Sequence, residues 1–362
     1  MSLEIVSDSA RLAEIAAQLA HAPAISLDTE FLRERTYRPQ LCLLQLAGNG
    51  IACCVDPLAG MSLEALKPLL SGSQPKILHA ARQDLEVLWP QFGQLSAIYD
   101  TQVAAALTGM PAQIGYSELV RRLLGITLAK AETRTDWSRR PLSAAQLQYA
   151  IDDVVHLQAL REALDAEIER LGRRAWLEEE LRDLTRADRL FVDPEKAVEK
   201  LRWNGELDPD RARLAQKLAA WREQRAIDRD RPRSWILDDS ALRGIVLRVP
   251  RSSAELSAVT DLTPGFVERS GEAVLQVIDS AALPATLPPP AQRPRPDPVL
   301  QARVKRLGAA VQARAQQLSL AAELLATRRD LESIARGTAV SEVLQGWRAA
   351  VLGDALSAAL QD

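Results

Sequence analysis

Two acidic residues in an apolar segment are the first feature of this 362-residue sequence that could do chemistry. Asp28 and Glu30 lie in the run from Ala24 to Phe31, which has the composition of a β-strand. Side chains at positions i and i+2 of a strand point to the same face, so both carboxylates would project together. Two acids on a core strand repel each other and lose hydration unless a cation compensates. The pair suggests a metal site, although a strand end whose acids face solvent has the same spacing.

Further acids and a tyrosine occur near the ends of other expected elements. Asp84 lies five residues after His79, at the expected start of a helix. Tyr149 and Asp153 are four apart in a segment of helical periodicity, so they would share one face. Asp152 also lies near that face, and spacing alone does not choose between the two aspartates.

These residues fall in three motifs that occur in a fixed order. The sequence resembles the DEDD superfamily of 3′→5′ exonucleases in Leu27–Phe31, His79–Leu85 and Tyr149–Val154. A tyrosine four residues before the last aspartate is typical of the tyrosine-type branch, and this spacing selects Asp153 over Asp152. The connecting segments that resemble the ribonuclease D family in particular are Arg38–Leu46 and Lys130–Leu142.

The resemblance implies a two-metal hydrolytic site. Asp28, Glu30, Asp84 and Asp153 would bind two Mg²⁺ or Mn²⁺ ions, because hard divalent cations prefer oxygen ligands. One ion would activate the attacking water, and the other would stabilise the leaving 3′-oxygen. Tyr149 would position the water or the phosphate, since a pKa near 10 makes tyrosine a poor free base at neutral pH. The product would be a 5′-nucleoside monophosphate.

Two further residues of the motifs are candidate substrate contacts. Phe31 could stack on a terminal base or fill the core. His79 could support the metal site or be a hydrogen-bonded structural histidine at a strand end.

The elements that must position these residues are strands followed by helices. Strands are expected over 24–31, 41–46, 51–55 and 76–79, with a hairpin turn over Gly48–Gly50. Ser143 is a good N-cap for one long helix that extends to about Leu160. Asp100 resembles a helix cap and not a ligand. We expect an α/β fold, which the resemblance specifies as a ribonuclease H-like exonuclease domain with a mixed sheet over residues 1–190.

The second half of the chain is helical in pattern. Residues 207–283 resemble an HRDC domain, the helical module shared by ribonuclease D and RecQ-type helicases. From Leu207 to Arg233 the segment has eight basic and five acidic residues. That modest excess fits either a solvated helix face or phosphate contacts. We expect Trp221 and Trp235 in the core of this domain.

A proline-rich segment divides the helical half in two. Seven prolines lie between Pro284 and Pro298, and such a run cannot continue a helix. We therefore expect a linker over 284–298 and a second all-α bundle over 299–362. The second bundle resembles a divergent HRDC copy in Leu324–Leu325, Leu331 and Gly346–Arg348.

Composition limits the kind of partner and the compartment. The formal net charge is −3 and the isoelectric point about 5.8, so any binding of nucleic acid needs local basic patches. No apolar run reaches the length of a membrane span, and the first residues do not resemble an export signal. Cys42, Cys53 and Cys54 lie in apolar strand-like runs, as expected of buried thiols in a reducing cytoplasm.

These observations together predict a cytoplasmic, monomeric 3′→5′ exoribonuclease. Its expected substrates are RNAs with a 3′ extension, above all tRNA precursors and other small structured RNAs. Two alternatives stay open on the sequence: a DNA 3′→5′ exonuclease and a non-catalytic RNA-binding protein.

Overall fold

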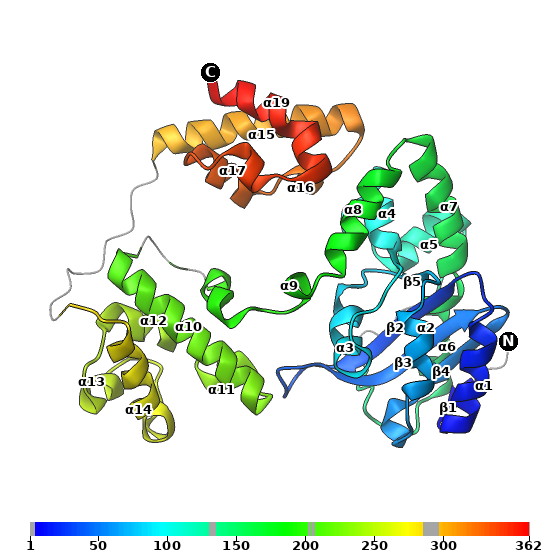
Figure 1. Ribbon diagram of the computed structural model, residues 1–362, viewed down its shortest axis with the longest axis horizontal. Coiled ribbons are helices and arrows are strands. Elements are labelled where there is room, and N and C mark those ends of the chain that lie inside the picture. The colour runs from blue at the N-terminus through cyan, green and yellow to red at the C-terminus, as the bar shows by residue number, and fades with distance from the viewer. Residues whose placement is uncertain (1–3, 130–134, 202, 204–206, 285–296, 362) are drawn as a thin grey trace. The chain divides into compact units, whose positions relative to one another are not determined.

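The chain forms two compact units, which we describe separately. The computed structural model describes residues 4–129, 135–201, 203, 207–284 and 297–361 (Figure 1). The first unit contains Met1–Leu32, Gln40–Leu190 and Asp297–Asp362, and the second contains Arg33–Pro39 and Phe191–Pro296. Most of the expected proline-rich linker, residues 285–296, lies outside the described residues. Among the described helices, none combines the length and the apolarity that a bilayer crossing requires.

A six-stranded mixed sheet forms the centre of the first unit. The strands are β1 (Glu4–Val6), β2 (Ile25–Leu32), β3 (Gln40–Gly48), β4 (Ile51–Val55), β5 (Lys76–Leu78) and β6 (Ile98–Asp100). Their order in the sheet is β1-β4-β3-β2-β5-β6. β2, β3 and β4 are antiparallel neighbours, whereas β5 pairs parallel with both β2 and β6. The predicted α/β fold with a mixed sheet is confirmed.

The four predicted strands and the hairpin turn are present. β3 ends at Gly48 and β4 begins at Ile51, and the two residues between them have φ angles of 51° and 78°. Positive φ at both central positions is what a tight hairpin turn requires, and Asn49 and Gly50 supply it easily. β1 and β6, of three residues each, were not predicted.

Helices cover the sheet and bring in the remaining candidate residues. They are α1 (Ser9–Leu19), α2 (Lys67–Ser71), α3 (Arg82–Phe92), α4 (Thr101–Leu107), α5 (Tyr116–Leu124), α6 (Ala144–Val155), α7 (Leu157–Arg170), α8 (Arg174–Leu184) and α9 (Ala187–Leu190). Three short 3₁₀ segments, Pro57–Ala59, Glu64–Leu66 and Pro194–Lys200, complete the helical elements up to residue 200. α6 contacts β2, β3 and β4.

The predicted start of α6 is correct and its predicted length is wrong. Ser143 accepts the Gln146 backbone N–H, and the Gln146 side chain accepts the Ser143 N–H, which completes a capping box. The expected single helix is interrupted at His156 (φ −98°, ψ −8°), where α6 ends and α7 begins. Periodicity alone misses such a break, because apolar positions on both sides continue to face the core.

The buried side chain of Lys76 should lower the free energy of unfolding of the protein. Its side chain is fully buried at the start of β5, its ammonium donates to the Gly72 carbonyl at 2.6 Å, and burial lowers its pKa to about 8. We expect Lys76→Met to raise the free energy of unfolding at pH 7 by about 1–2 kcal/mol, because the variant buries no charge. In the parent, the free-energy cost of burying the Lys76 charge is fully present below pH 8. It disappears as the pH rises to the unfolded pKa of 10.5.

Urea unfolding of both proteins from pH 7 to pH 10.5 measures this difference. Lys67→Met is the matched control, because the Lys67 ammonium is exposed and pairs with Glu64 at 2.7 Å. A Lys76→Met variant that is no more stable than the parent at pH 7 would contradict the prediction.

The C-terminal helices belong to the first unit and form a bundle of their own. They are α15 (Pro298–Leu318), α16 (Ala322–Leu325), α17 (Arg328–Ala335), α18 (Val340–Val343) and α19 (Gly346–Gln361). These helices agree with the all-α bundle that we expected over residues 299–362. Its buried apolar residues continue the core of α4, α7 and α8.

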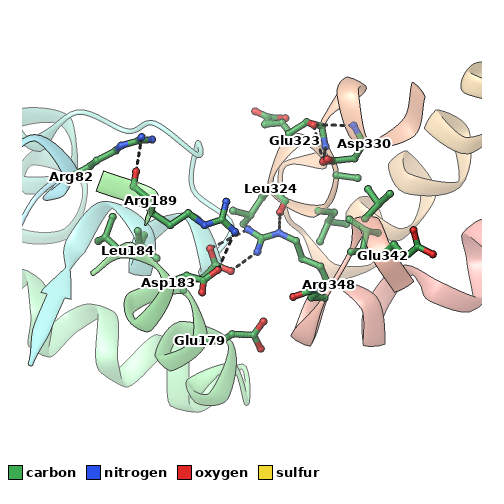
Figure 2. Close-up of a pocket in the computed structure, with 18 residues that line it drawn as sticks. Arg82, Glu179, Asp183, Leu184, Arg189, Glu323, Leu324, Asp330, Glu342 and Arg348 are labelled. Carbon is green, nitrogen blue, oxygen red and sulfur yellow. Dashed lines mark hydrogen bonds and ion pairs between the residues drawn. The ribbon is translucent and has the colours of Figure 1, made fainter. Parts of the chain in front are cut away.

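Polar contacts fix this bundle to α8. The indole ring of Trp347 stacks on Trp176 with ring centroids 4.7 Å apart. The Trp347 indole N–H donates to Glu180 Oε1 at 2.6 Å, and Arg348 donates to both oxygens of the same carboxylate at 2.5 and 3.0 Å. Glu179, shown with Arg348 in Figure 2, accepts the backbone N–H of Trp347 at the start of α19. The bundle is attached to side chains of α8 that lie 167 or 168 residues before their partners in α19.

The second unit is a helical bundle together with the loop that joins β2 to β3. Its helices are α10 (Pro209–Arg229), α11 (Arg233–Ile236), α12 (Asp239–Arg248), α13 (Ser253–Ser257) and α14 (Pro264–Ser280). Asp208 caps α10, and Pro209 occupies its first turn. No described residue after Asp100 belongs to a strand.

The two tryptophans of this unit have different environments. Trp221 is partly buried against the helical core, as expected. The expectation for Trp235 is wrong, because 58% of it is exposed. α11 has a single turn, in which neighbouring side chains point in different directions, and Ile236 occupies the buried position.

Candidate active site

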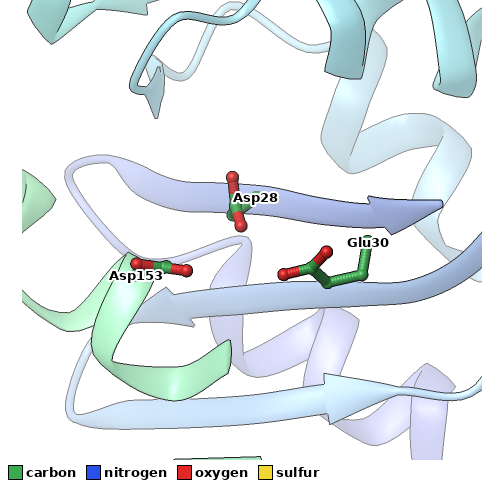
Figure 3. A group of neighbouring side chains, drawn as sticks. All are labelled: Asp28, Glu30 and Asp153. Atoms are coloured by element: carbon green, nitrogen blue, oxygen red, sulfur yellow. The ribbon is translucent and has the colours of Figure 1, made fainter. Parts of the chain in front are cut away.

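Three carboxylates converge at one place on the sheet. β2 presents Asp28 and Glu30 on one face, and α6 brings Asp153 over that face (Figure 3). One oxygen from each of the three lies within 4.8 Å of the others. The register of β2 against β3 shifts between Glu30 and Phe31, so a bulge directly follows the second acid. Such bulges redirect side chains next to functional sites.

Asp84 reaches the same region from α3. It lies in the first turn of that helix and is buried, and its Oδ1 accepts a hydrogen bond from the Thr29 hydroxyl at 2.5 Å. Asp100 accepts the backbone N–H groups of Ala80 and Ala81 at 3.0 and 2.8 Å, which fixes the entry to α3. Asp100 also caps α4, as predicted. Thr29, between the two acids of β2, is a contact that sequence reasoning missed.

The candidate residues line one cavity of about 270 Å³. The lining includes all seven residues singled out in the sequence: Asp28, Glu30, Phe31, His79, Asp84, Tyr149 and Asp153. Asp152 does not line this cavity, and its carboxylate instead accepts the Gln148 amide at 2.8 Å. Thr29, Ala80, Gln83 and Tyr116 complete the wall.

Burial and mutual repulsion raise the pKa values of the four acids. Burial raises the pKa of Asp28 well above its usual range, and Asp84, Asp153 and Glu30 raise it further. Burial, with repulsion from Asp153 and Asp84, raises the pKa of Glu30 to about 8. Burial likewise raises the pKa values of Asp84 and Asp153 to about 7, although a hydrogen bond from Thr29 or Tyr149 opposes the rise. Among the described residues that line the cavity, no lysine or arginine compensates these charges.

The donor set fits a hard divalent cation. None of the described residues that line the cavity is a lysine or an arginine. Every charged group offered is a carboxylate, the ligand that Mg²⁺ and Mn²⁺ prefer. A cation bound between three such oxygens would remove the repulsion that raises their pKa values. The cavity is therefore suited to divalent metal.

Tyr149 lies one helical turn before Asp153 on α6. Its ring packs beside Trp137, with centroids 6.1 Å apart, and its hydroxyl hydrogen-bonds to Asp153. Burial raises the pKa of the Tyr149 hydroxyl, and Asp153 and Glu30 raise it further. The hydroxyl is thus protonated at neutral pH and can donate a hydrogen bond.

His79 lines the cavity with both ring nitrogens occupied. Nδ1 lies 2.9 Å from the Thr101 hydroxyl, and Nε2 lies 3.0 Å from the Ile114 carbonyl oxygen. Burial lowers the pKa of the imidazole, so the neutral ring with a proton on Nε2 fits these contacts. Tyr116, which sequence reasoning missed, packs edge-on against this ring and donates to the Asp152 carbonyl at 2.9 Å.

Comparison with known families divides the chain in the same way. The sequence profile of the 3′→5′ exonuclease family matches residues 3–169. The profile of the HRDC domain matches residues 211–278, within the second unit.

Individual relatives match over nearly the whole chain. Ribonuclease D of Nitrobacter hamburgensis is 37% identical over 359 residues, which cover 98% of this chain and 94% of the relative. Ribonuclease D of Jannaschia sp. is 40% identical over 97% of this chain and 94% of its own length. The crystal structure of Escherichia coli RNase D, described as an exoribonuclease involved in structured RNA processing, superposes with a TM-score of 0.86. That match has 31% identity and covers 100% of this chain and 99% of the other. The chain therefore belongs to the ribonuclease D family of 3′→5′ exoribonucleases.

Proposed function

We propose that the carboxylate cavity hydrolyses the terminal phosphodiester of RNA with two divalent cations, Mg²⁺ or Mn²⁺. The observation that carries this proposal is the convergence of Asp28, Glu30 and Asp153 in a cavity whose described lining residues include no lysine or arginine. These three and Asp84 would hold the ions. Bound there, divalent cations supply Lewis acidity for the attacking water and for the charge on the leaving 3′-oxygen.

The protein's own residues would position the substrate for this step. Tyr149, protonated and one turn from Asp153, would donate a hydrogen bond that orients the water or the phosphate, as in the tyrosine-type branch. Phe31 lines the cavity directly after the bulge, where its ring would contact the terminal base. His79 would support the wall through its contacts with Thr101 and Tyr116.

The helical parts would hold the RNA. We propose the domain boundaries 1–190 for the exonuclease, 207–283 for the first HRDC domain and 299–362 for a divergent second copy, joined by the linker 284–298. The support for a second copy is its helical bundle. Substrates would be tRNA precursors and other small structured RNAs, trimmed at the 3′ end by a monomeric, cytoplasmic enzyme.

Digestion of a tRNA that carries extra 3′ nucleotides tests this proposal. We expect 5′-nucleoside monophosphates and stepwise shortening from the 3′ end, with Mg²⁺ or Mn²⁺ and not with EDTA. A DNA oligonucleotide of matched sequence serves as competitor. Faster hydrolysis of the DNA, or equal digestion in EDTA, would contradict the proposal.

Tyr149→Phe separates positioning from metal binding. We expect kcat to fall by about 10- to 100-fold, because the variant keeps the ring beside Trp137 and loses only the hydroxyl. Metal affinity measured by calorimetry should change little, since the carboxylates are intact. A kcat equal to that of the parent would assign Tyr149 a purely structural role.

A further inference from the structure

The loop that leaves the catalytic strand is fixed to the helical unit. Arg33–Pro39 joins β2 to β3, yet it clusters with the helices that follow residue 190. The Tyr37 hydroxyl donates to Glu223 of α10, and the backbone N–H of Arg38 donates to Asp230 Oδ1 at 3.0 Å. The loop and the start of the helical bundle therefore form a single surface.

A buried acid holds this surface together. Glu223 is only 1% exposed, and Arg233 Nε lies 2.6 Å from its carboxylate. The guanidinium carbon of Arg233 lies 5.8 Å from the centre of the Tyr37 ring, in cation–π range. Burial and Glu223 raise the pKa of Tyr37 to about 12, so its hydroxyl stays a donor to the acid.

A cavity of about 490 Å³ lies between the loop and the helices. Four basic and two acidic side chains line this cavity. One basic and one acidic residue of these, Arg222 and Asp239, form an ion pair at 2.6 Å. The other basic residues are Arg33, Lys200 and Arg233. Hydroxyl groups of Thr36, Tyr37 and Ser234 also line the cavity. Basic and hydroxyl groups together are the donors that phosphate oxygens accept from.

The charge of this cavity differs from that of the larger cavity in the first unit. That cavity, of about 610 Å³, has six acidic and three basic side chains in its wall, with Glu179, Asp183 and Glu342 among the acids (Figure 2). Net negative charge repels an RNA backbone. Of these two cavities, only the one beside the loop has the sign that RNA needs.

An exposed aromatic ring adjoins the basic cavity. Trp235 follows Ser234 of the cavity wall in the chain, and 58% of it is exposed. The guanidinium carbon of Arg231 lies 5.8 Å from the centre of its ring. Exposed indoles beside basic groups are platforms on which unpaired bases stack.

The loop of this surface is joined directly to the strand that carries Asp28 and Glu30. Arg33 follows Glu30 by three residues, and three residues of extended chain span at most about 11 Å. The backbone of Arg33 must therefore stay within that distance of Glu30. The loop that lines the basic cavity thus continues directly from the strand that carries Asp28 and Glu30.

We propose that this loop–helix cavity binds a phosphate of single-stranded RNA upstream of the scissile bond, while a neighbouring base stacks on Trp235. The inference rests on the proposed exonuclease function and adds a substrate contact outside the acidic site. In this proposal, the loop after β2 and α11 bind the RNA together.

The test compares Trp235→Ala with the parent on RNAs of two lengths. For an unstructured oligoribonucleotide of about 12 nucleotides, we expect KM to rise about fivefold or more with little change in kcat. For a dinucleotide, which leaves one nucleotide upstream of the scissile bond, kcat/KM should be unchanged. Trp235→Tyr, which keeps an aromatic face, should restore most of the affinity. A merely structural role would affect both lengths equally.

Leu247→Ala is the matched control, because Leu247 is an exposed apolar residue of the same unit. Unchanged KM for the longer RNA in Trp235→Ala would overturn the inference. Binding of the same RNA in EDTA, measured by fluorescence anisotropy, tests the inferred RNA contact independently of the proposed hydrolysis. A weaker Kd in Trp235→Ala supports the contact even if no RNA is hydrolysed, and an equal Kd refutes it. Lys200→Gln should also make the dependence of Kd on salt less steep.

Discussion

Asp28→Asn is expected to abolish exonuclease activity and to stabilise the metal-free protein. The carboxylate lies with those of Glu30 and Asp153 in the acidic cavity, so its loss removes a proposed metal ligand and should lower kcat by about 10³-fold or more. The same substitution removes one of several charges that repel one another where burial already penalises them. The metal-free variant should therefore unfold at a higher temperature than the parent.

The gain in stability should depend on pH in a defined direction. The pKa of Asp28 is higher in the folded chain than in the unfolded chain, so the folded chain holds the extra proton between the two values. The free energy of unfolding of the parent thus falls as the pH rises through this window. The advantage of Asp28→Asn should be small near pH 4 and larger at pH 7.

Addition of divalent metal should reverse the order of stability. A divalent cation should bind the folded parent more tightly than the variant, which lacks one of the proposed ligands, and should raise the parent's melting temperature above that of the variant. Asp152→Asn is the matched control, because Asp152 is adjacent to Asp153 and lies outside the cavity. Full activity in Asp28→Asn, or equal stabilisation of both proteins by metal, would contradict the site.

Glu180→Ala is expected to detach the C-terminal bundle from α8. The carboxylate accepts the Trp347 indole N–H and two N–H groups of Arg348, and the variant leaves these donors without that acceptor. Charge-assisted bonds of this kind are worth about 1.5–3 kcal/mol each, and partly buried donors lose more when unpaired. We expect a loss of about 2–4 kcal/mol in the free energy of docking.

Hydrogen exchange measures the detachment directly. The amide protons at the start of α19 should exchange faster in the variant, since the Trp347 N–H is held by Glu179 of the same helix α8. Glu178→Ala is the control on α8, because Glu178 is exposed. Unchanged protection of α19 in Glu180→Ala would show that the Trp176–Trp347 stack holds the bundle by itself.

The sequence determined the local parts of this structure. Asp28 and Glu30 share a face because a strand repeats every two residues, and Tyr149 and Asp153 share one because a helix repeats about every four. The Asn49–Gly50 turn and the caps at Ser143 and Asp208 were predictable for the same reason, since a few adjacent residues supply all of the interactions. Motif order then joined Asp84 to these pairs.

Local sequence patterns gave wrong predictions where contacts with distant residues determine the structure. The environment of Trp235 was predicted wrongly, because composition does not show which residue of a one-turn helix faces the core. The break at His156 was missed for a similar reason, since both α6 and α7 keep an apolar face.

Only the tertiary structure decided how the acids meet and what surrounds them. The approach of α6 to β2 brings Asp153 to Asp28 across 125 residues, and the Thr29–Asp84 bond spans 55. The attachment of the loop after β2 to α10, and of α19 to α8, likewise joins distant segments. Such contacts depend on the folding of the whole chain and have no periodic signature, so the sequence determines which residues can do the chemistry and the fold determines where they act.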